Sequence, residues 1–436
     1  MRHVCRSATA YASEPLIAGE CPRRIDGAAQ QPSGLLFVVV LCTLGRMFVF
    51  EIYRPQASIE LPASLKAASA KFSHRLDETR GFGSNPGRLR MFTYTPSSLV
   101  ERPALVVVLH GGGQSAAEYA HGAGWLTLAD RYGFALLMPE QQRSNNPTGC
   151  FNWYQREDTQ RGFGEAASIR EMIEAVERDK NIDPRRLFVT GLSAGGAMTS
   201  VLLACYPEVF SAGAIIAGLP YGAARNVQEA FLSMYQCPSR PGIEWGGLVR
   251  SAAPQHNGPW PRVSVWHGNA DRTVVPLNAR EIVKQWIDVH ELPDTLSEDT
   301  TAEGYPRQVW TNDALEQVVE YYSITDMAHG TPLATGGADI ECGTAGPYLL
   351  EVGISSSFHI ASFFHLTTVD PGLADAEPCA SGPTTHQNNP DSRRRELPRS
   401  FASTPRQVAP ERRTPPGDIG AVITAALKSA GLLGRG

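Results

Sequence analysis

The sequence lacks the features that mark several common classes of protein. Its net charge is −5, so no excess of positive charge suggests binding to nucleic acid. None of its eight cysteines forms a C-x-x-C pair, which argues against a zinc site or a thioredoxin-type redox centre. No internal repeat is visible. Some cysteines could pair as disulfides if the protein is exported, but the sequence does not show which; they are Cys5, Cys21, Cys42, Cys150, Cys205, Cys237, Cys342 and Cys379.

The chain also lacks an apolar run long enough for a stable membrane span. Residues 35–50 are largely apolar, but Arg46 interrupts them. A run of this length suits the apolar region of an export signal. Two interpretations of the N-terminal segment 1–69 therefore stay open. It holds an export signal, which places the protein outside the cell or in the periplasm, or translation starts downstream at Met47 and the protein is cytoplasmic.

The composition is that of a soluble globular protein, with 42% apolar and 19% charged residues. From residue 70 to 366, short apolar runs alternate with helical patterns such as 165–181 and 278–290. Apolar strands that alternate with amphipathic helices indicate a parallel sheet covered on both faces. We therefore predict an α/β domain over 70–366, with a mostly parallel central sheet. Its strands are expected at 104–109, 134–138, 187–190, 212–217, 262–266 and 318–324.

The composition changes after residue 366. Residues 367–417 are dominated by Pro, Ser, Thr, Gln and Arg, with few large apolar side chains. Such a segment buries too little apolar surface to offset the chain entropy lost on ordering, so we expect a disordered linker. Residues 418–436 fit a short amphipathic helix that Asp418 caps. Docking on the domain and binding of a partner are both open for this helix.

Residues 191–195 read Gly-Leu-Ser-Ala-Gly and join a predicted strand to a predicted helix. The motif alone is weak, because the chain holds 41 glycines among 436 residues. Its context is that of a nucleophile elbow, in which a tight turn lifts a serine hydroxyl above the sheet. We predict that Ser193 is a nucleophile. A purely structural crossover is the alternative.

A serine nucleophile needs a base to take its proton and an acid to orient that base. Asp271 and His329 each follow a predicted strand, in the order Ser, Asp, His that such folds use. Asp326, close to His329, is the alternative acid. His267 is expected to shape a turn, and His359 has the apolar surroundings of a core or pocket wall. The remaining competitors, His290, Asp288 and Asp313, lie in or near helical stretches.

Three glycines, 111–113, follow the strand that ends before His110. Backbone N–H groups there can approach a developing oxyanion, and the Ala194 N–H is the expected second donor. The run lacks the Lys–Ser/Thr pair of a P-loop and the G-x-G-x-x-G spacing of a dinucleotide site. An oxyanion hole is therefore favoured over a nucleotide site.

With "LHGGGQSA", "GLSAGGAM", "WHGNADRTVVP" and "AHGTPL" in place, residues 85–365 resemble the PHB depolymerase family of esterases. These are α/β-hydrolases grouped with feruloyl and acetylxylan esterases. The resemblance implies that Ser193, Asp271 and His329 are nucleophile, acid and base. It also implies that Gly112 stands where many members have a cysteine, at an oxyanion-hole position. Cys150 would then lack a disulfide partner.

The resemblance implies an ester of a hydroxyalkanoate or of a plant-wall acid as substrate, without choosing between them. Aromatic residues expected on the loops above the sheet are candidate substrate contacts, although core packing explains some of them. No polymer-binding module is recognisable in the C-terminal extension, so a soluble ester or oligomer is expected. The candidate contacts are Trp153, Tyr221, Trp245 and Trp260.

The sequence thus predicts a serine carboxylester hydrolase that acts through an acyl-enzyme and needs no metal or cofactor. A serine peptidase of the prolyl-oligopeptidase type is the first alternative, because it shares the order of the three residues. A non-catalytic hydrolase-fold binding protein is the second. No stable membrane span and no nucleic-acid partner are expected, and the oligomeric state is open.

Overall fold

The structure, a computed structural model, describes residues 37–43, 46–52, 75–336 and 340–367. The chain divides into two units, Met1–Pro62 and Ala63–Gly436. In the first, β1 (Phe37–Thr43) and β2 (Arg46–Ile52) pair antiparallel, and they cover most of the apolar run considered above as an export signal. The predicted linker, apart from residue 367, and the predicted terminal helix lie outside the described residues.

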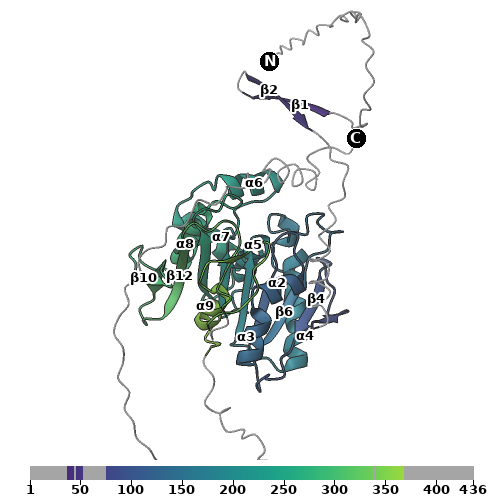
Figure 1. The fold of residues 1–436 in the computed structure, drawn as a ribbon, viewed down its shortest axis with the longest axis vertical. Coiled ribbons are helices and arrows are strands. Elements are labelled where there is room, and N and C mark those ends of the chain that lie inside the picture. The colour runs from purple at the N-terminus through teal and green to yellow at the C-terminus, as the bar shows by residue number, and fades with distance from the viewer. Residues whose placement is uncertain (1–36, 44–45, 53–74, 337–339, 368–436) are drawn as a thin grey trace, which may run out of the picture. The chain divides into compact units, whose positions relative to one another are not determined.

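A ten-stranded sheet forms the centre of the second unit, in the order β10-β11-β12-β9-β8-β7-β5-β6-β4-β3 (Figure 1). The six strands from β12 to β6 are all parallel to one another. They are β5 (Leu105–Leu109), β6 (Ala135–Glu140), β7 (Leu187–Leu192), β8 (Ala212–Ile216), β9 (Arg262–Gly268) and β12 (Gln317–Ile324). These are the six predicted strands, and the predicted α/β architecture is confirmed.

Antiparallel strands extend the sheet at both edges. The pairs are β3 (Asp77–Thr79) with β4 (Arg90–Tyr94), and β10 (Glu298–Ala302) with β11 (Tyr305–Thr311). The sequence did not predict these strands, because they carry no continuous apolar run. In β10, four of the five residues are exposed. A separate short pair, β13 (Thr331–Leu333) and β14 (Leu349–Glu351), is parallel.

Helices cover both faces of the sheet (Figure 1). In β5, Leu105, Val107 and Leu109 face one layer, whereas Val106 and Val108 face the other, because side chains alternate along a strand. The first layer holds α4 (Gly164–Lys180), α5 (Ala194–Cys205), α7 (Gly242–Ala252) and α8 (Leu277–Val289), and the second holds α2 (Ala116–Gly122), α3 (Trp125–Tyr132) and α9 (Ser356–Phe363). Among the described residues, no helix has both the length and the apolar character needed to cross a membrane.

Helix α5 is enclosed on all sides. All twelve of its residues are buried, including the polar Thr199 and Ser200. Their hydroxyls donate to the carbonyl oxygens of Gly195, at 2.9 Å, and Leu219, at 2.7 Å. A buried hydroxyl without a partner would destabilise the fold, so these bonds make the two polar residues compatible with the core.

Glu165, the second residue of α4, is a buried carboxyl that ties this helix to the segment after β6. It accepts hydrogen bonds from the Gln141 side chain and from the backbone N–H of Asn152, at 2.8 Å. Burial raises the pKa of Glu165 from 4.5 to about 8, and the nearby Asp158 adds to the effect, whereas the hydrogen bonds oppose it. The native state therefore holds a proton here that the unfolded chain releases at lower pH.

We expect the contribution of Glu165 to the free energy of unfolding to fall as the pH rises from about 4.5 to about 8, by a few kcal/mol at most. The sign follows from the raised pKa of Glu165, because over this interval this carboxyl group binds a proton in the native state and releases it in the unfolded state. Urea unfolding at several pH values should show this contribution as the difference between the native protein and Glu165→Gln, which cannot ionise. Between pH 4.5 and 8, the free energy of unfolding of the native protein should decrease relative to that of Glu165→Gln, whatever that variant's absolute stability.

Glu171→Gln, on the same helix, is the matched control. Hydrogen bonds from Ser84 and Asn85 lower the pKa of Glu171 although burial opposes them, so this group contributes stability that is lost on acidification. The decrease in the free energy of unfolding that Glu165 causes between pH 4.5 and 8 should therefore persist in Glu171→Gln. Equal slopes in the native protein and Glu165→Gln would contradict the assignment to Glu165.

Candidate active site

The four predicted parts of the site follow four parallel strands. Gly112 follows β5, Ser193 follows β7, Asp271 follows β9 and His329 follows β12. Because the strands are parallel, these loops all leave the same, carboxyl edge of the sheet. The strand order places β7 beside β5, and β9 beside β12. The topology thus collects residues that are up to 217 positions apart at one edge.

Ser193 occupies a tight turn between β7 and α5. Its φ of 56° and ψ of −114° are strained for a residue with a side chain. The backbone holds the turn, because the Ser193 N–H donates to the Ile216 carbonyl at 2.9 Å and its own carbonyl accepts from the Ala197 N–H at 2.8 Å. The residue is partly exposed, whereas Leu192 and Ala194 on either side are buried. This is the geometry of a nucleophile elbow.

Two glycines allow this turn to pack against the end of β5. A Cβ on Gly195 would lie 2.3 Å from the Leu109 carbonyl oxygen, and one on Gly191 would lie 2.5 Å from the backbone of Gly195. Any side chain at either position would push α5 away from β5. The close packing brings the start of α5 next to the loop that carries Gly112.

Asp271 and His329 are hydrogen bonded to each other. The distance from His329 Nδ1 to Asp271 Oδ2 is 2.7 Å, and the Asp271 side chain is fully buried. The other carboxylate oxygen, Oδ1, accepts the backbone N–H groups of Thr273 at 2.8 Å and Val274 at 2.9 Å. Burial alone would raise the pKa of Asp271, but the hydrogen bonds from His267 and His329 hold it well below its usual range.

His267 also contacts this carboxylate, which the sequence did not predict. It is fully buried on β9, with Nε2 3.2 Å from Asp271 Oδ2 and 2.8 Å from the Val274 carbonyl oxygen. Asp326, the alternative acid, belongs to the turn after β12, where its N–H donates to the Asn269 side chain. Asp271 is therefore the carboxylate that holds His329.

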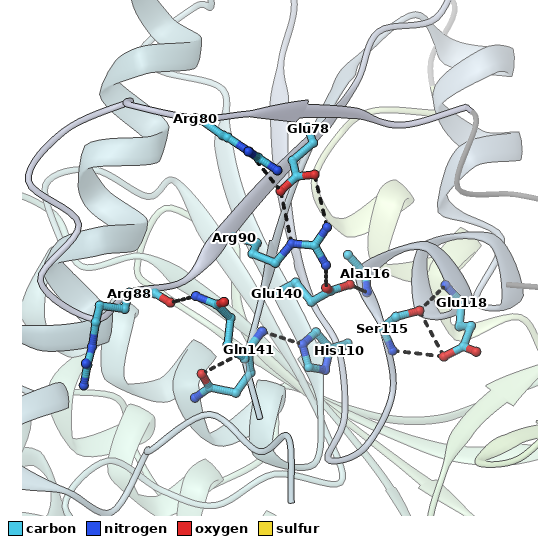
Figure 2. A network of polar contacts seen from close by, with 11 residues as sticks. Glu78, Arg80, Arg88, Arg90, His110, Ser115, Ala116, Glu118, Glu140 and Gln141 are labelled. Atoms are coloured by element: carbon cyan, nitrogen blue, oxygen red, sulfur yellow. Dashed lines mark hydrogen bonds and ion pairs between the residues drawn. The ribbon is translucent and has the colours of Figure 1, made fainter. Parts of the chain in front are cut away.

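The loop after β5 is fixed through His110. The Gln141 N–H donates to His110 Nε2 at 3.1 Å (Figure 2). The imidazole proton is therefore on Nδ1, which lies 2.8 Å from the Gly111 carbonyl oxygen. Burial lowers the pKa of His110 to about 4 and keeps it neutral. The Gly111 carbonyl and the Gly112 N–H belong to one planar peptide group. Within the described residues, the Gly112 N–H donates to no acceptor.

Figure 2 shows how the far end of this loop is anchored. Ser115 caps α2 through a reciprocal pair of hydrogen bonds with Glu118. Glu140, the last residue of β6, accepts the Ala116 N–H at 2.9 Å and also pairs with Arg90 on β4. The loop therefore lies between two fixed points, the His110 ring and the start of α2.

Gly112 lies directly against Cys150. A Cβ on Gly112 would be 2.4 Å from Cys150 Sγ and 3.9 Å from its Cβ. The Cβ–Cβ distance is within the range found in disulfides. Cys150 is a free thiol, as are Cys205, Cys237 and Cys342. The placement agrees with the expectation that Cys150 lacks a partner where glycine stands at position 112.

Two of the four predicted aromatic contacts lie elsewhere. Trp245 is buried between α7 and α8, and its indole N–H donates to Glu281 at 2.6 Å. Trp260 precedes β9, a strand of seven residues that spans about 23 Å, so it lies at the opposite edge of the sheet. There it lines a cavity of about 1430 Å³ together with His256. Neither position fits a contact with a substrate at Ser193.

The other two predictions have different outcomes. The Tyr221 side chain lies beside Cys205, the last residue of α5. A helix of twelve residues is about 18 Å long, so this ring packs far from the end that carries Ser193. Trp153 follows β6, on the same segment as Cys150, and is largely buried beside Tyr154. It remains a prediction as a substrate contact.

The structure adds an aromatic residue that the sequence did not single out. The Tyr348 ring lies edge-on to the His329 ring, with a centroid distance of 6.0 Å. It is 48% exposed and has a φ of 61°, unfavourable for an aromatic residue. Its carbonyl accepts the Thr331 N–H at 2.8 Å, which holds the conformation. A strained, exposed ring beside His329 is a candidate substrate contact.

His359 pairs with Glu303 at 3.0 Å and lines a separate cavity of about 600 Å³. This agrees with the predicted pocket-wall position.

No group of three or more His, Cys, Asp or Glu residues in the described part of the chain is arranged to hold a metal ion.

Comparisons with known proteins agree with this arrangement. Residues 90–305 match the family described as "Esterase PHB depolymerase". A poly(3-hydroxyalkanoate) depolymerase C of Paucimonas lemoignei is 42% identical over 298 residues, which are 68% of this chain and 72% of the depolymerase. An acetylxylan esterase of Coprinopsis cinerea is 35% identical, with 59% and 70% covered, and a feruloyl esterase B of Talaromyces funiculosus is 31% identical, with 59% and 73% covered.

Among solved structures, an acetyl xylan esterase from Aspergillus awamori matches with a TM-score of 0.57. The match covers 67% of this chain and 99% of that esterase at 22% identity, and it supports the fold. The resemblance stated from the motifs is therefore confirmed. The chain belongs to the PHB depolymerase family of esterases.

Proposed function

We propose that the protein is a serine carboxylester hydrolase that acts through an acyl-enzyme, with Ser193, Asp271 and His329 as nucleophile, acid and base. The observation that carries the proposal is the 2.7 Å hydrogen bond from His329 to a buried carboxylate, at the sheet edge where Ser193 stands in a strained turn. A hydroxyl needs such a base to become nucleophilic.

In the proposed reaction, Ser193 Oγ attacks the ester carbonyl and His329 Nε2 takes its proton. Asp271 holds the imidazole by its other nitrogen and stabilises the positive charge that forms. The Gly112 and Ala194 N–H groups donate to the oxyanion. Collapse of the tetrahedral intermediate expels the alcohol, which takes the proton from His329. Water then attacks the acyl-enzyme by the same steps and releases the acid. These steps use only the chain's own residues and water.

We propose short esters and oligomers of hydroxyalkanoates as the first substrates to test. The reason is that the depolymerase is more similar to this chain than the acetylxylan esterase and the feruloyl esterase are. Acetyl and feruloyl esters are the second group. The apolar run 35–50 supports export of the protein, with a cytoplasmic location as the alternative.

The first prediction from the site concerns the acyl-enzyme. Mixing the protein with 4-nitrophenyl butyrate should give a stoichiometric burst of nitrophenol followed by steady turnover. Ser193→Ala should abolish the burst and lower kcat by about 10⁶-fold, because the nucleophile is gone. Asp271→Asn should lower kcat by about 10⁴-fold, because the imidazole loses the carboxylate that orients it.

Three outcomes would replace the proposal with an alternative. Turnover that survives in Ser193→Ala would make Ser193 a structural turn only. Faster cleavage of a chromogenic dipeptide amide than of acyl esters would favour the peptidase. Failure to react with a fluorophosphonate probe would favour the binding protein.

The second prediction concerns Tyr348. If its ring contacts the substrate, Tyr348→Ala should raise KM for an aromatic or apolar ester by roughly fivefold, the value of one aromatic contact. Tyr348→Phe keeps the ring and should recover most of the affinity. Steady-state kinetics of both variants decide the matter. The same KM in Tyr348→Ala and the native protein would remove this residue from the site.

The third prediction concerns the contact between Gly112 and Cys150. Gly112→Cys should form a disulfide with Cys150 under oxidising conditions, because the two Cβ atoms would lie 3.9 Å apart. Closing a loop of roughly forty residues should stabilise the fold by about 3 to 4 kcal/mol relative to the reduced protein. Thiol titration and urea unfolding, with and without reductant, measure both effects.

The double variant Gly112→Cys, Cys150→Ser is the control. It should lack the bond and should show no difference between oxidised and reduced samples. If the cysteines at positions 112 and 150 both stay free thiols in oxidised Gly112→Cys, the loop holds their Cβ atoms further apart than 3.9 Å.

A further inference from the structure

We propose that His267 is a positioning residue for the proposed reaction: its Nε2–H donates to Asp271 Oδ2 and so fixes the oxygen that receives His329. This inference rests on the proposed roles of Ser193, Asp271 and His329. It assigns His267 more than the shaping of a turn.

The contacts of His267 settle which nitrogen carries its proton. Nε2 lies 2.8 Å from the Val274 carbonyl oxygen, which can only accept a hydrogen bond. The proton is therefore on Nε2. Asp271 Oδ2 lies 3.2 Å from the same nitrogen, and a hydrogen bond with His267 helps to lower the pKa of Asp271, so we assign the one N–H to both the carbonyl and the carboxylate. Within the described residues, His267 Nδ1 is buried and has no partner, so a second proton there would find no acceptor.

The shared N–H completes the surroundings of the Asp271 carboxylate. Oδ1 accepts two backbone N–H groups, whereas Oδ2 lies 2.7 Å from His329 Nδ1 and 3.2 Å from His267 Nε2. Without His267, Oδ2 would be held only by His329, the group that has to change its protonation state during the reaction. A carboxylate fixed from both sides keeps the imidazole in one orientation, which catalysis requires to within a fraction of an ångström.

His267 lies on a rigid element, which a positioning residue requires. It is the sixth residue of β9, paired in register with Ser323 of β12, and it is fully buried. Because β9 is an interior strand of the sheet, the imidazole cannot move independently of the sheet edge.

The titratable groups placed against the two imidazoles are Asp271, between them, and Tyr348, whose ring contacts the His329 ring.

The inference predicts an effect on the pH profile. Loss of the His267 donor would leave more negative charge on Asp271 Oδ2, and this charge favours the protonated imidazole of His329. In His267→Phe, the acid limb of kcat/KM should therefore move to higher pH by about half a unit or more. The plateau of kcat should also fall on the order of tenfold, because the carboxylate is held less firmly.

The experiment compares five proteins. His267→Phe removes the donor and keeps the volume, whereas His267→Gln places an amide N–H near the position of Nε2 and should restore the acid limb and most of kcat. His290→Phe is the control for replacing a histidine by phenylalanine, because His290 Nε2 also meets a carbonyl, that of Pro261 at 3.1 Å, at the far end of α8. Its profile should match that of the native protein. Ser193→Ala completes the set, with Tm measured for each protein.

The outcomes separate the inference from the proposed function. Turnover in Ser193→Ala would overturn the proposed function itself. An inactive Ser193→Ala with the native acid limb and kcat in His267→Phe would overturn only the role of His267. If His267→Phe does not fold, His267→Gln decides alone. A His267→Gln variant with the native Tm and a shifted acid limb would also contradict the inference, because its amide donor would then not replace the donor of His267.

Discussion

The close contact between the start of α5 and the end of β5 is the constraint on which the site depends. With glycine at 191 and 195, the turn that carries Ser193 lies against the Leu109 carbonyl, at a distance that no side chain would permit. This contact sets Ser193 and the Ala194 N–H beside the loop of Gly112. The backbone strain at Ser193 is the cost of that proximity, and the buried helix and strand on either side hold it in place.

The Asp271 carboxylate is stabilised by hydrogen-bond donors, and within the described residues no Lys or Arg side chain pairs with it. The Asp271 carboxylate is buried, yet its hydrogen bonds come from two backbone N–H groups and two imidazoles. On the other side, His110 is kept neutral by burial and fixes a peptide group without adding a charge near the proposed oxyanion. In a low-dielectric site, fixed dipoles of this kind stabilise developing charge without the reorganisation that water would need.

The fold could be predicted from the sequence, as could the placement of the residues proposed for catalysis after parallel strands, because each has a local signal. Buried parallel strands appear as apolar runs, and the residues after them fall at one edge of the sheet. The edge strands have no such signal, since β10 is polar and exposed. The roles of the aromatic residues were harder to predict for another reason. Whether Trp245 or Trp260 faces a substrate depends on the path of the chain between strands, and composition does not record it. His267 and Tyr348 are recognised only once their neighbours in space are known.

The enclosure of α5 has a consequence for how such a protein can change. Every residue of the helix that follows Ser193 is surrounded by the core, so almost any replacement there alters volume or leaves a polar group unpaired. Mutational tolerance should therefore be lowest along α5 and higher in the loops at the carboxyl edge. New specificity in this lineage, whether selected in nature or in the laboratory, has to enter through those loops, while the helix beneath them stays nearly constant.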